Sequence, residues 1–128
     1  MVAEQQCEFF RRFDPKRDRV WVALDQGQPR GALTIDGPRP EGGREWARLR
    51  FFILDEALRG QGLGRRIIAE AMQFCRQQQY RRVCLTTTAG LDAALRLYYR
   101  HGFSLVSEAS NGFHGSQTRE QTLEWRMD

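Results

Sequence analysis

Residues 58–66 read Leu58-Arg59-Gly60-Gln61-Gly62-Leu63-Gly64-Arg65-Arg66, with a glycine at every second position from 60 to 64, and an amphipathic pattern follows at once. Glycine lets the backbone approach a ligand closely and adopt dihedral angles that other residues avoid. The free N–H groups at a helix start point outward with the positive end of the helix dipole, so oxygen anions bind there. The stretch therefore predicts a phosphate-binding loop ahead of a helix.

Two common phosphate-binding loops do not fit these residues. A mononucleotide P-loop ends in Gly-Lys-Ser or Gly-Lys-Thr, whereas the only lysine of the chain is Lys16. A dinucleotide fingerprint places its third glycine three residues after the second and an acidic residue about 20 residues further on. Here the third glycine comes two residues after the second, and residues 77–82 contain no carboxylate. The flanking residues thus exclude the first loop and argue against the second.

The stretch resembles instead the acyl-CoA pyrophosphate loop of the GNAT N-acetyltransferases, whose pattern is Arg or Gln, two residues, Gly, one residue, then Gly or Ala. Arg59, Gly62 and Gly64 match that pattern. Residues 94–103 are similar to the family's second signature, Ala-x-x-Leu-Tyr followed by three residues and Gly-Phe. The chain between Gly64 and Tyr98 has room for a helix, a strand and a second helix. Both signatures therefore point to one family.

A weaker resemblance extends further along the chain. Residues 49–108 and 121–125 are similar to the acetyltransferase half of bacterial proteins that fuse a MarR-type DNA-binding domain to a GNAT domain, and no MarR-like half is present in this sequence. The resemblance implies an α/β fold with a GNAT-like mixed, mostly antiparallel sheet and helices on both faces, shortened at the N-terminus. Strands that alternate with two helices in the sequence indicate the same class.

The resemblance also implies acetyl-CoA as cosubstrate, bound without a metal. In the family the central strand splays from one neighbour, and main-chain groups near its end bind the pantetheine arm and the thioester carbonyl. By position these groups belong to Phe52, Ile53 and Leu54. The expected cofactor-binding residues are Ile53, Leu54, Arg59, Gly60, Gln61, Gly62, Leu63, Gly64 and Arg65.

The catalytic residue that the resemblance implies is Tyr98, at the Leu-Tyr position of the second signature. A phenol there would protonate the leaving sulfur as a general acid, while main-chain N–H near Leu54 would stabilise the negative charge on the carbonyl oxygen. Packing on the inner face of the helix is the alternative role of Tyr98. The general base stays open between Glu45 and Asp55, each acting through water.

Apolar periodicity places the secondary structure. We expect strands at residues 20–24, 31–35, 45–54, 83–87, 103–107 and 122–127, and helices at 4–13, 63–79 and 92–101. The first helix is expected to bury Cys7, Phe10 and Phe13.

The strand at residues 45–54 carries an informative alternation. Its pattern predicts that Ala47, Leu49, Phe51 and Ile53 share one face, and that Trp46, Arg48, Arg50 and Phe52 share the other. Two guanidinium groups on one face of a central strand need acceptors. Either structural carboxylates satisfy them, or Arg50 binds a substrate carboxylate, as in an amino acid.

Length and composition bound the remaining possibilities. We expect 128 residues to form a single domain, residues 1–128, that buries its own core. We see neither a signal peptide nor an apolar stretch of the roughly 20 residues that a membrane span needs, and we expect a cytoplasmic protein with no membrane partner. The three cysteines, at 7, 75 and 84, and the two histidines lack metal-ligand spacing.

The net charge of +4 arises entirely from residues 59–128, where ten basic residues face six acidic ones. No aromatic-interleaved basic run accompanies them, which disfavours a nucleic-acid partner. One polyanionic ligand such as coenzyme A explains the excess, with Arg59, Arg65 and Arg66 placed to attract it.

Two functions remain open after these observations. The first is an N-acetyltransferase that moves an acetyl group from acetyl-CoA to a primary amine of a small molecule or amino acid by direct attack. The second is a non-catalytic acyl-CoA-binding module, since Leu91 stands where the family commonly has asparagine. The family also has a further strand and two helices before residue 20, so we consider a homodimer that completes the acceptor pocket.

Overall fold

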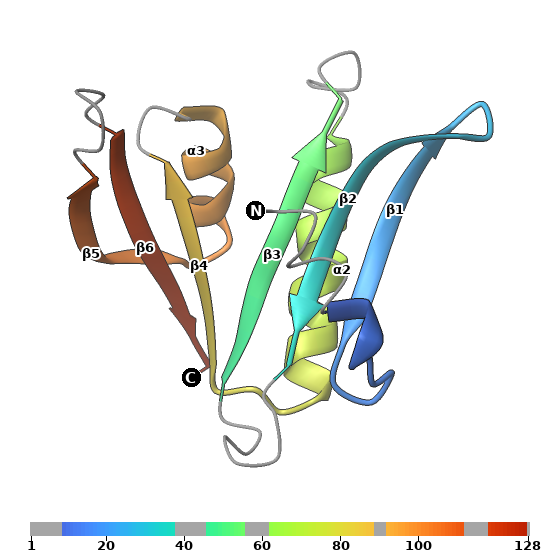
Figure 1. Ribbon diagram of the computed structural model, residues 1–128, viewed down its shortest axis with the longest axis horizontal. Coiled ribbons are helices and arrows are strands. Elements are labelled where there is room, and N and C mark those ends of the chain that lie inside the picture. The colour runs from blue at the N-terminus through green and yellow to red at the C-terminus, as the bar shows by residue number, and fades with distance from the viewer. Residues whose placement is uncertain (1–8, 38–45, 56–61, 89–91, 112–117, 128) are drawn as a thin grey trace.

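The computed structural model describes residues 9–37, 46–55, 62–88, 92–111 and 118–127 (Figure 1). Within these ranges the chain forms one six-stranded sheet, two helices and a helical segment at residues 9–11. The strands are β1 (Arg19–Asp25), β2 (Gln28–Asp36), β3 (Trp46–Leu54), β4 (Arg82–Thr88), β5 (Ser104–Asn111) and β6 (Thr118–Arg126), and the helices are α2 (Leu63–Gln77) and α3 (Asp92–Arg100). None of the described helices has both the length and the apolar character to cross a lipid bilayer.

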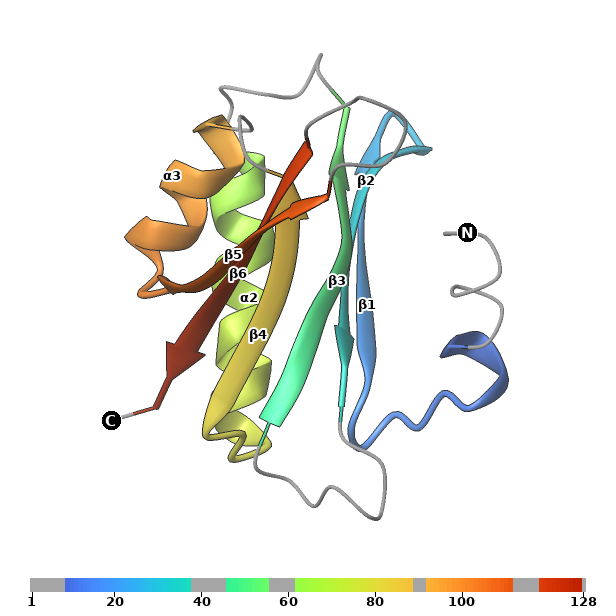
Figure 2. The ribbon, with the colours of Figure 1, turned by 60° about the vertical axis from the view of Figure 1, so that its left-hand side comes forward.

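The sheet has the strand order β1-β2-β3-β4-β6-β5, and only the β3–β4 pair is parallel among its described neighbours. The predicted mixed, mostly antiparallel sheet is therefore confirmed. In Figure 2, α2 and α3 lie on one side of the sheet, and the helical turn at residues 9–11 lies on the other.

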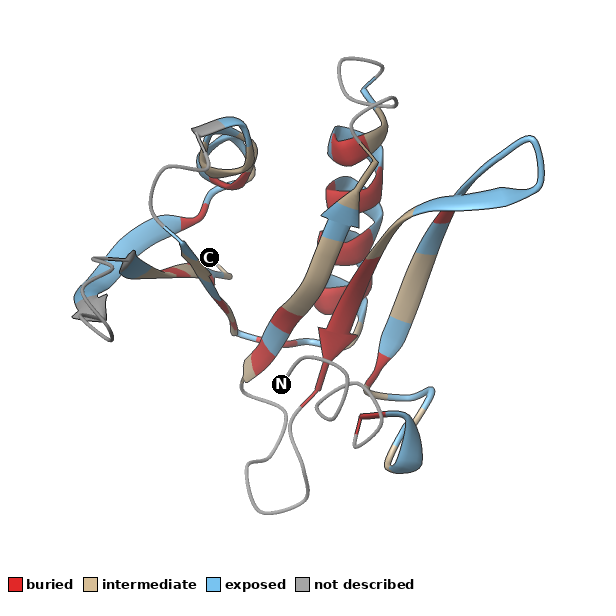
Figure 3. Ribbon diagram, turned by 45° about the horizontal axis from the view of Figure 1, so that its top comes forward, coloured by how far each residue is buried: buried red, intermediate tan, exposed pale blue. Residues whose placement is uncertain are grey.

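Helix α2 covers the half of the sheet that contains β1, β2 and β3. Its apolar residues recur at spacings of three and four, which gives one apolar face. The ring of Phe74 packs edge-on against Trp21 of β1, with centroids 5.7 Å apart. Figure 3 shows the buried residues of α2 and of β2 and β3. The core between them contains Leu33, Ile35, Ala47, Leu49, Ile67, Ile68, Ala71, Met72, Phe74 and Cys75.

Strands β3 and β4 pair only at the end where β3 begins. The paired residues are Trp46 with Arg82, Ala47 with Val83, and Arg48 with Cys84. Beyond these residues the two strands diverge, and the sheet opens as a V (Figure 1). The rest of β3 therefore presents one edge of its main chain to this opening instead of to a neighbouring strand.

The N-terminal helix differs from its prediction. Residues 9–11 are helical, and residues 4–8 of the predicted helix lie outside the described residues. Phe9 is 1% exposed, whereas Phe10, which was expected to be buried, is 62% exposed. Helical spacing alone could not reveal this orientation, because it depends on a partner from another strand: Arg12 pairs with Asp36 of β2 through two contacts of 3.0 Å.

The alternation predicted for β3 holds up to Arg50 and is wrong beyond it. Phe51 has φ 54°, and the pairing with β2 shifts register at this point, so β3 contains a bulge. The extra residue reverses which face the following side chains occupy. Phe52 therefore packs against the core, and Ile53 is 60% exposed.

The last two strands are longer than the sequence predicted. Their pairing runs from Ser104 with Glu124 to Asn111 with Thr118. Residues toward the far end of this hairpin are mostly polar, so hydrophobic alternation could not reveal it. Main-chain hydrogen bonds continue the two strands through residues that have no apolar alternation.

Candidate functional site

The opening between β3 and β4 brings together the end of β3, the start of α2 and one face of α3. Gly64 lies where they meet, since a Cβ atom there would be 3.2 Å from Leu97 Cδ2 and 3.4 Å from Leu54 Cδ2. Glycine is therefore needed at this position for close packing of the two helices and the strand. Binding of the cofactor by Gly64 stays a prediction.

The start of α2 is free of side-chain caps. Gly62 takes the N-cap position in the left-handed region, with φ 75° and ψ 5°, and makes no side-chain cap hydrogen bond. The first hydrogen bond within the helix runs from Arg66 N–H to Gly62 C=O at 3.1 Å. The N–H groups of residues 63–65 precede it and have no acceptor within the helix. No acidic residue lies in this first turn, so the positive end of the helix is available to an anion.

Open space lies beside Gly62, because a Cβ atom built on this residue meets nothing within 4 Å. The guanidinium-bearing residues Arg65 and Arg66 are exposed on the same turn. Gly62 and Gly64, which look alike in the sequence, thus have different surroundings. The first borders solvent at a helix start, and the second is enclosed by side chains.

The bulge at Phe51 determines which main-chain groups of β3 face the opening. Asp55 N–H donates to Arg30 C=O of β2 at 2.6 Å. Successive N–H groups of a strand alternate between its two sides, so the N–H of Leu54 points away from β2 and toward the opening. The carbonyl oxygen of Ile53 lies on the β2 side, 2.9 Å from where a Cβ of Gly31 would be.

Of the three residues expected near the thioester, Leu54 and Phe52 therefore direct their main chain to the opening. Ile53 directs its main chain to β2 instead. This assignment depends on the phase of the strand after the bulge, which the sequence pattern did not reveal.

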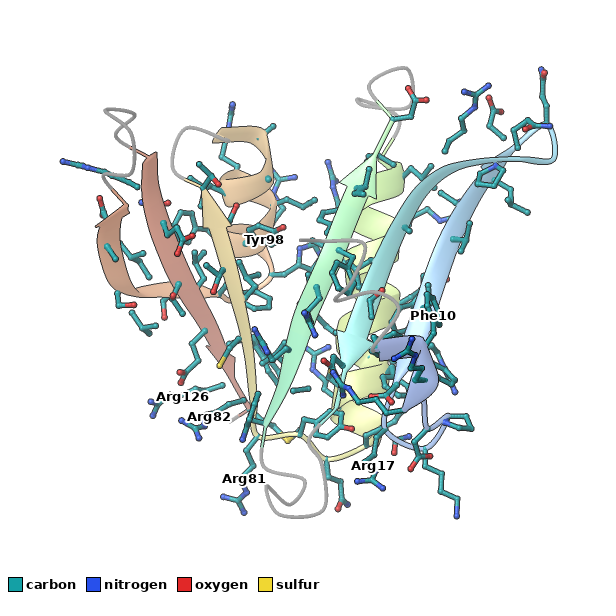
Figure 4. All side chains as sticks on the ribbon, in the orientation of Figure 1. Phe10, Arg17, Arg81, Arg82, Tyr98 and Arg126 are labelled. Atoms are coloured by element: carbon teal, nitrogen blue, oxygen red, sulfur yellow. The ribbon has the colours of Figure 1, made fainter. Side chains whose placement is uncertain are left out.

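Tyr98 lies on α3, beside the same opening (Figure 4). It is 6% exposed, and its ring contacts Phe52 at 6.2 Å and Phe103 at 5.9 Å between centroids. Burial raises the pKa of Tyr98 to about 12, so the phenol keeps its proton throughout the physiological range. This environment suits a proton donor and equally suits a packing residue.

Phe52 is a residue of the site that the alternation placed on the wrong face. It packs against Tyr98 and approaches α2, with Cζ 3.8 Å from a Cβ at Gly64. Two consecutive phenylalanines in an otherwise alternating strand are the one sequence signal of the bulge. Either phenylalanine could have pointed into the core, so the sequence alone did not decide which face the side chains after Arg50 occupy.

Arg50 has a structural carboxylate partner. Its Nη1 donates to Asp36 Oδ2 at 2.8 Å, and Asp36 is 4% exposed. The guanidinium also lies over the Phe51 ring, 4.7 Å from its centroid. The structure therefore gives Arg50 a structural carboxylate, which was one of the two alternatives for this residue. Binding of a substrate carboxylate by Arg50 stays a prediction.

Several predicted site residues fall elsewhere. Arg59, Gly60 and Gln61 lie outside the described residues, as does Glu45, one candidate base. The other candidate, Asp55, contacts Arg30 Nη1 at 3.3 Å. In the described ranges no group of three or more His, Cys, Asp and Glu residues is placed to hold a metal ion.

Not all of the basic excess lies at the start of α2. Figure 4 shows Arg81, Arg82 and Arg126 at the other end of the sheet, where β3 begins. The charge of the C-terminal half therefore does not map onto one ligand site.

Comparisons with known proteins give a family and a fold. The model of the acetyltransferase (GNAT) family matches residues 1–103. N-acetyltransferase 8 of Rattus norvegicus is 34% identical over 92 residues, which cover 70% of this chain and 40% of that protein. N-acetylaspartate synthetase of Danio rerio is 32% identical over 97 residues, which cover 76% of this chain and 33% of that protein.

A solved acetyltransferase from Salmonella typhimurium, with its cofactor acetyl-CoA, superposes with a TM-score of 0.81 at 16% identity and covers 98% of this chain and 73% of that one. This likeness shows a shared fold. The chain spans 40% of the rat relative and 33% of the Danio rerio relative.

Proposed function

Because this chain belongs to the acetyltransferase (GNAT) family, we propose that it transfers an acetyl group from acetyl-CoA to a primary amine of a small molecule or amino acid. The observation that carries the proposal is the divergence of β3 from β4, with an uncapped helix start at one end and Tyr98 of α3 beside it. The space beside Gly62 fits a pyrophosphate, and the splayed edge of β3 fits an extended amide-bearing arm.

Acetyl-CoA would supply the activated acyl carbon and a thiolate leaving group. The N–H groups of residues 63–65 and the guanidinium groups of Arg65 and Arg66 would hold its pyrophosphate. The Leu54 N–H would donate to the thioester oxygen as the amine attacks and the C–N bond forms, a type of contact commonly worth about 10²–10³ in rate.

Tyr98 would donate its phenolic proton to the sulfur as the C–S bond breaks. Among the described residues the phenol has no hydrogen-bond partner, so its O–H is available for this transfer. The proton lost by the attacking amine would pass to water or to Asp55. Tyr98 then recovers its proton from solvent.

The amine that we propose as the acceptor of the acetyl group is an amino acid. The Danio rerio relative, by its name, makes N-acetylaspartate, which supports an amino acid as the amine. We also propose that the protein works in a bacterial cytoplasm and is similar to the acetyltransferase half of MarR/GNAT fusion proteins.

A further proposal is a homodimer that completes the acceptor pocket. Val22, Ala32 and Ile53 are paired in a row across three strands, and the exposure of Val22 (53%) and Ile53 (60%) supports a covering partner on this face.

A second candidate function is a non-catalytic acyl-CoA-binding module. The close packing of Tyr98 between Phe52 and Phe103 favours it, since a buried ring needs no catalytic reason to be there.

Tyr98→Phe separates the two functions, because it removes only the hydroxyl. For the acetyltransferase we expect acetyl transfer to fall by about 10²–10⁴-fold, with the dissociation constant for acetyl-CoA changed less than threefold. The measurement is thiol release during a screen of amino acids and small amines, alongside calorimetry with acetyl-CoA. Equal turnover by both proteins would remove Tyr98 from catalysis, and binding without turnover in the wild type would favour the module.

A further inference from the structure

We propose that Asp36 and Arg50 are positioning residues, which hold the bulge at Phe51 and thereby set the geometry of the opening. The bulge itself is a feature of the described strand. Its consequence for ligand binding rests on the proposed function.

The first step is a fixed guanidinium. Asp36 is 4% exposed, and its Oδ2 accepts from Arg50 Nη1 at 2.8 Å and from Arg12 Nη2 at 3.0 Å. Charge-assisted hydrogen bonds to a buried carboxylate are short and directional. They hold Arg50 flat against the sheet, where its side chain is only 14% exposed.

The second step joins this guanidinium to the bulge. Arg50 lies over the ring of Phe51, 4.7 Å from its centroid, in a cation–π contact. Phe51 has φ 54°, a conformation that a bulky side chain rarely adopts. The surroundings must therefore favour it, and the stack on Arg50 is a contact of the Phe51 ring that can do so.

The third step is what the bulge places. A strand that lacks the extra residue would present every following side chain to the opposite face. With the bulge, Phe52 contacts Tyr98, and Leu54 approaches Gly64 at the start of α2. The same phase directs the Leu54 N–H to the opening. The ion pair between Asp36 and Arg50, on one face of the sheet, thus determines the main-chain geometry of β3 where it borders the opening.

The test is a double-mutant cycle that removes the stack from each side. Arg50→Lys keeps the charge but loses the planar fork, and Phe51→Leu loses the ring. We expect each single variant, and the double variant, to weaken acetyl-CoA binding by a similar factor of about tenfold in calorimetry. Phe51→Tyr keeps the ring and should bind as the wild type does. Asp36→Asn should weaken binding as Arg50→Lys does.

Amide exchange measured by NMR gives a second readout that needs no ligand. The Asp55 N–H bonds to β2 just past the bulge, and the Gln78 N–H bonds to Phe74 C=O in α2 at 2.9 Å. We expect exchange at Asp55 to accelerate about tenfold in Arg50→Lys and Phe51→Leu, while exchange at Gln78 is unchanged.

Matched controls come from the same network and the same face. Arg48→Lys changes an exposed arginine on the Arg50 face of β3, and Arg12→Ala removes the other arginine of Asp36. Arg48→Lys should bind acetyl-CoA as the wild type does, and Arg12→Ala should weaken binding less than Asp36→Asn does, because Arg50 keeps its carboxylate partner.

Three results would overturn the inference: losses that add in the double variant, equal acceleration at Asp55 and Gln78, or Arg12→Ala weakening binding as much as Asp36→Asn. Failure of the wild type to bind acetyl-CoA would instead count against the proposed function. The exchange data would still decide the role of the stack.

Discussion

At the scale of single residues, burial controls the proton chemistry of this molecule. Tyr98 and Cys75 both have a pKa raised to about 12, in each case chiefly because burial disfavours the charged form. For Tyr98 this keeps the proposed acid protonated until a thiolate develops next to it. For Cys75 it makes the thiol an inert part of the core, as its position on the apolar face of α2 indicated.

The raised pKa of Cys75 predicts a loss of stability in alkali. The thiol titrates near 9.0 when unfolded and near 12 when folded, so its contribution is fully present below about pH 9 and is lost as the pH rises toward 12. At pH 10.5 the loss is about 2 kcal/mol in the free energy of unfolding.

Urea unfolding at pH 7 and pH 10.5 measures this loss, with Cys75→Ala as the comparison, because the alanine variant has no thiol to titrate. The variant should lose less stability between the two pH values than the wild type. Equal losses in the two proteins would contradict the assigned pKa shift.

At the scale of elements, Gly62 and Gly64 have different surroundings, which the sequence pattern does not separate. Gly62 begins α2 in a left-handed conformation beside open space, while Gly64 lets α2 approach β3 and α3. The sequence pattern predicts phosphate binding for both glycines. The packing role requires knowledge of which elements meet there, and that depends on the fold.

Gly64→Val is predicted to destabilise the protein by about 1–3 kcal/mol. Its side chain would push against Leu97 and Leu54, which lie 3.2 and 3.4 Å from the Cβ position. Chemical denaturation followed by circular dichroism measures the change.

Ala69→Val is the matched control for this prediction, because Ala69 lies on the same helix with its side chain exposed. It should cost less than about 1 kcal/mol, the difference in helix propensity. A Gly64→Val protein as stable as the wild type would show that the three elements do not depend on this contact.

At the scale of the whole molecule, the sequence predicted the order and type of the described strands and of helices α2 and α3, but not the full length of β5 and β6. Apolar periodicity revealed α2 and α3, and the two signatures located Gly62 and Tyr98. Periodicity could not reveal the bulge at Phe51, because a single residue in an unusual conformation leaves the apolar content of a strand unchanged. It also missed the partner of Arg50, since Asp36 lies on a different strand and only the register brings them together.

The central claim is that the start of α2 holds the pyrophosphate of acetyl-CoA, and the measurement that tests it most directly is a calorimetric titration of the full chain with acetyl-CoA. Gly62→Glu places a carboxylate and a bulky side chain where the phosphates would bind. Gly27→Glu introduces the same side chain at another positive-φ glycine, with equally open surroundings, in the β1–β2 turn.

We expect the wild type and Gly27→Glu to bind acetyl-CoA with dissociation constants within about threefold of each other, and Gly62→Glu to lose at least about 100-fold in affinity. Equal binding by all three proteins, or none by the wild type, would contradict the account.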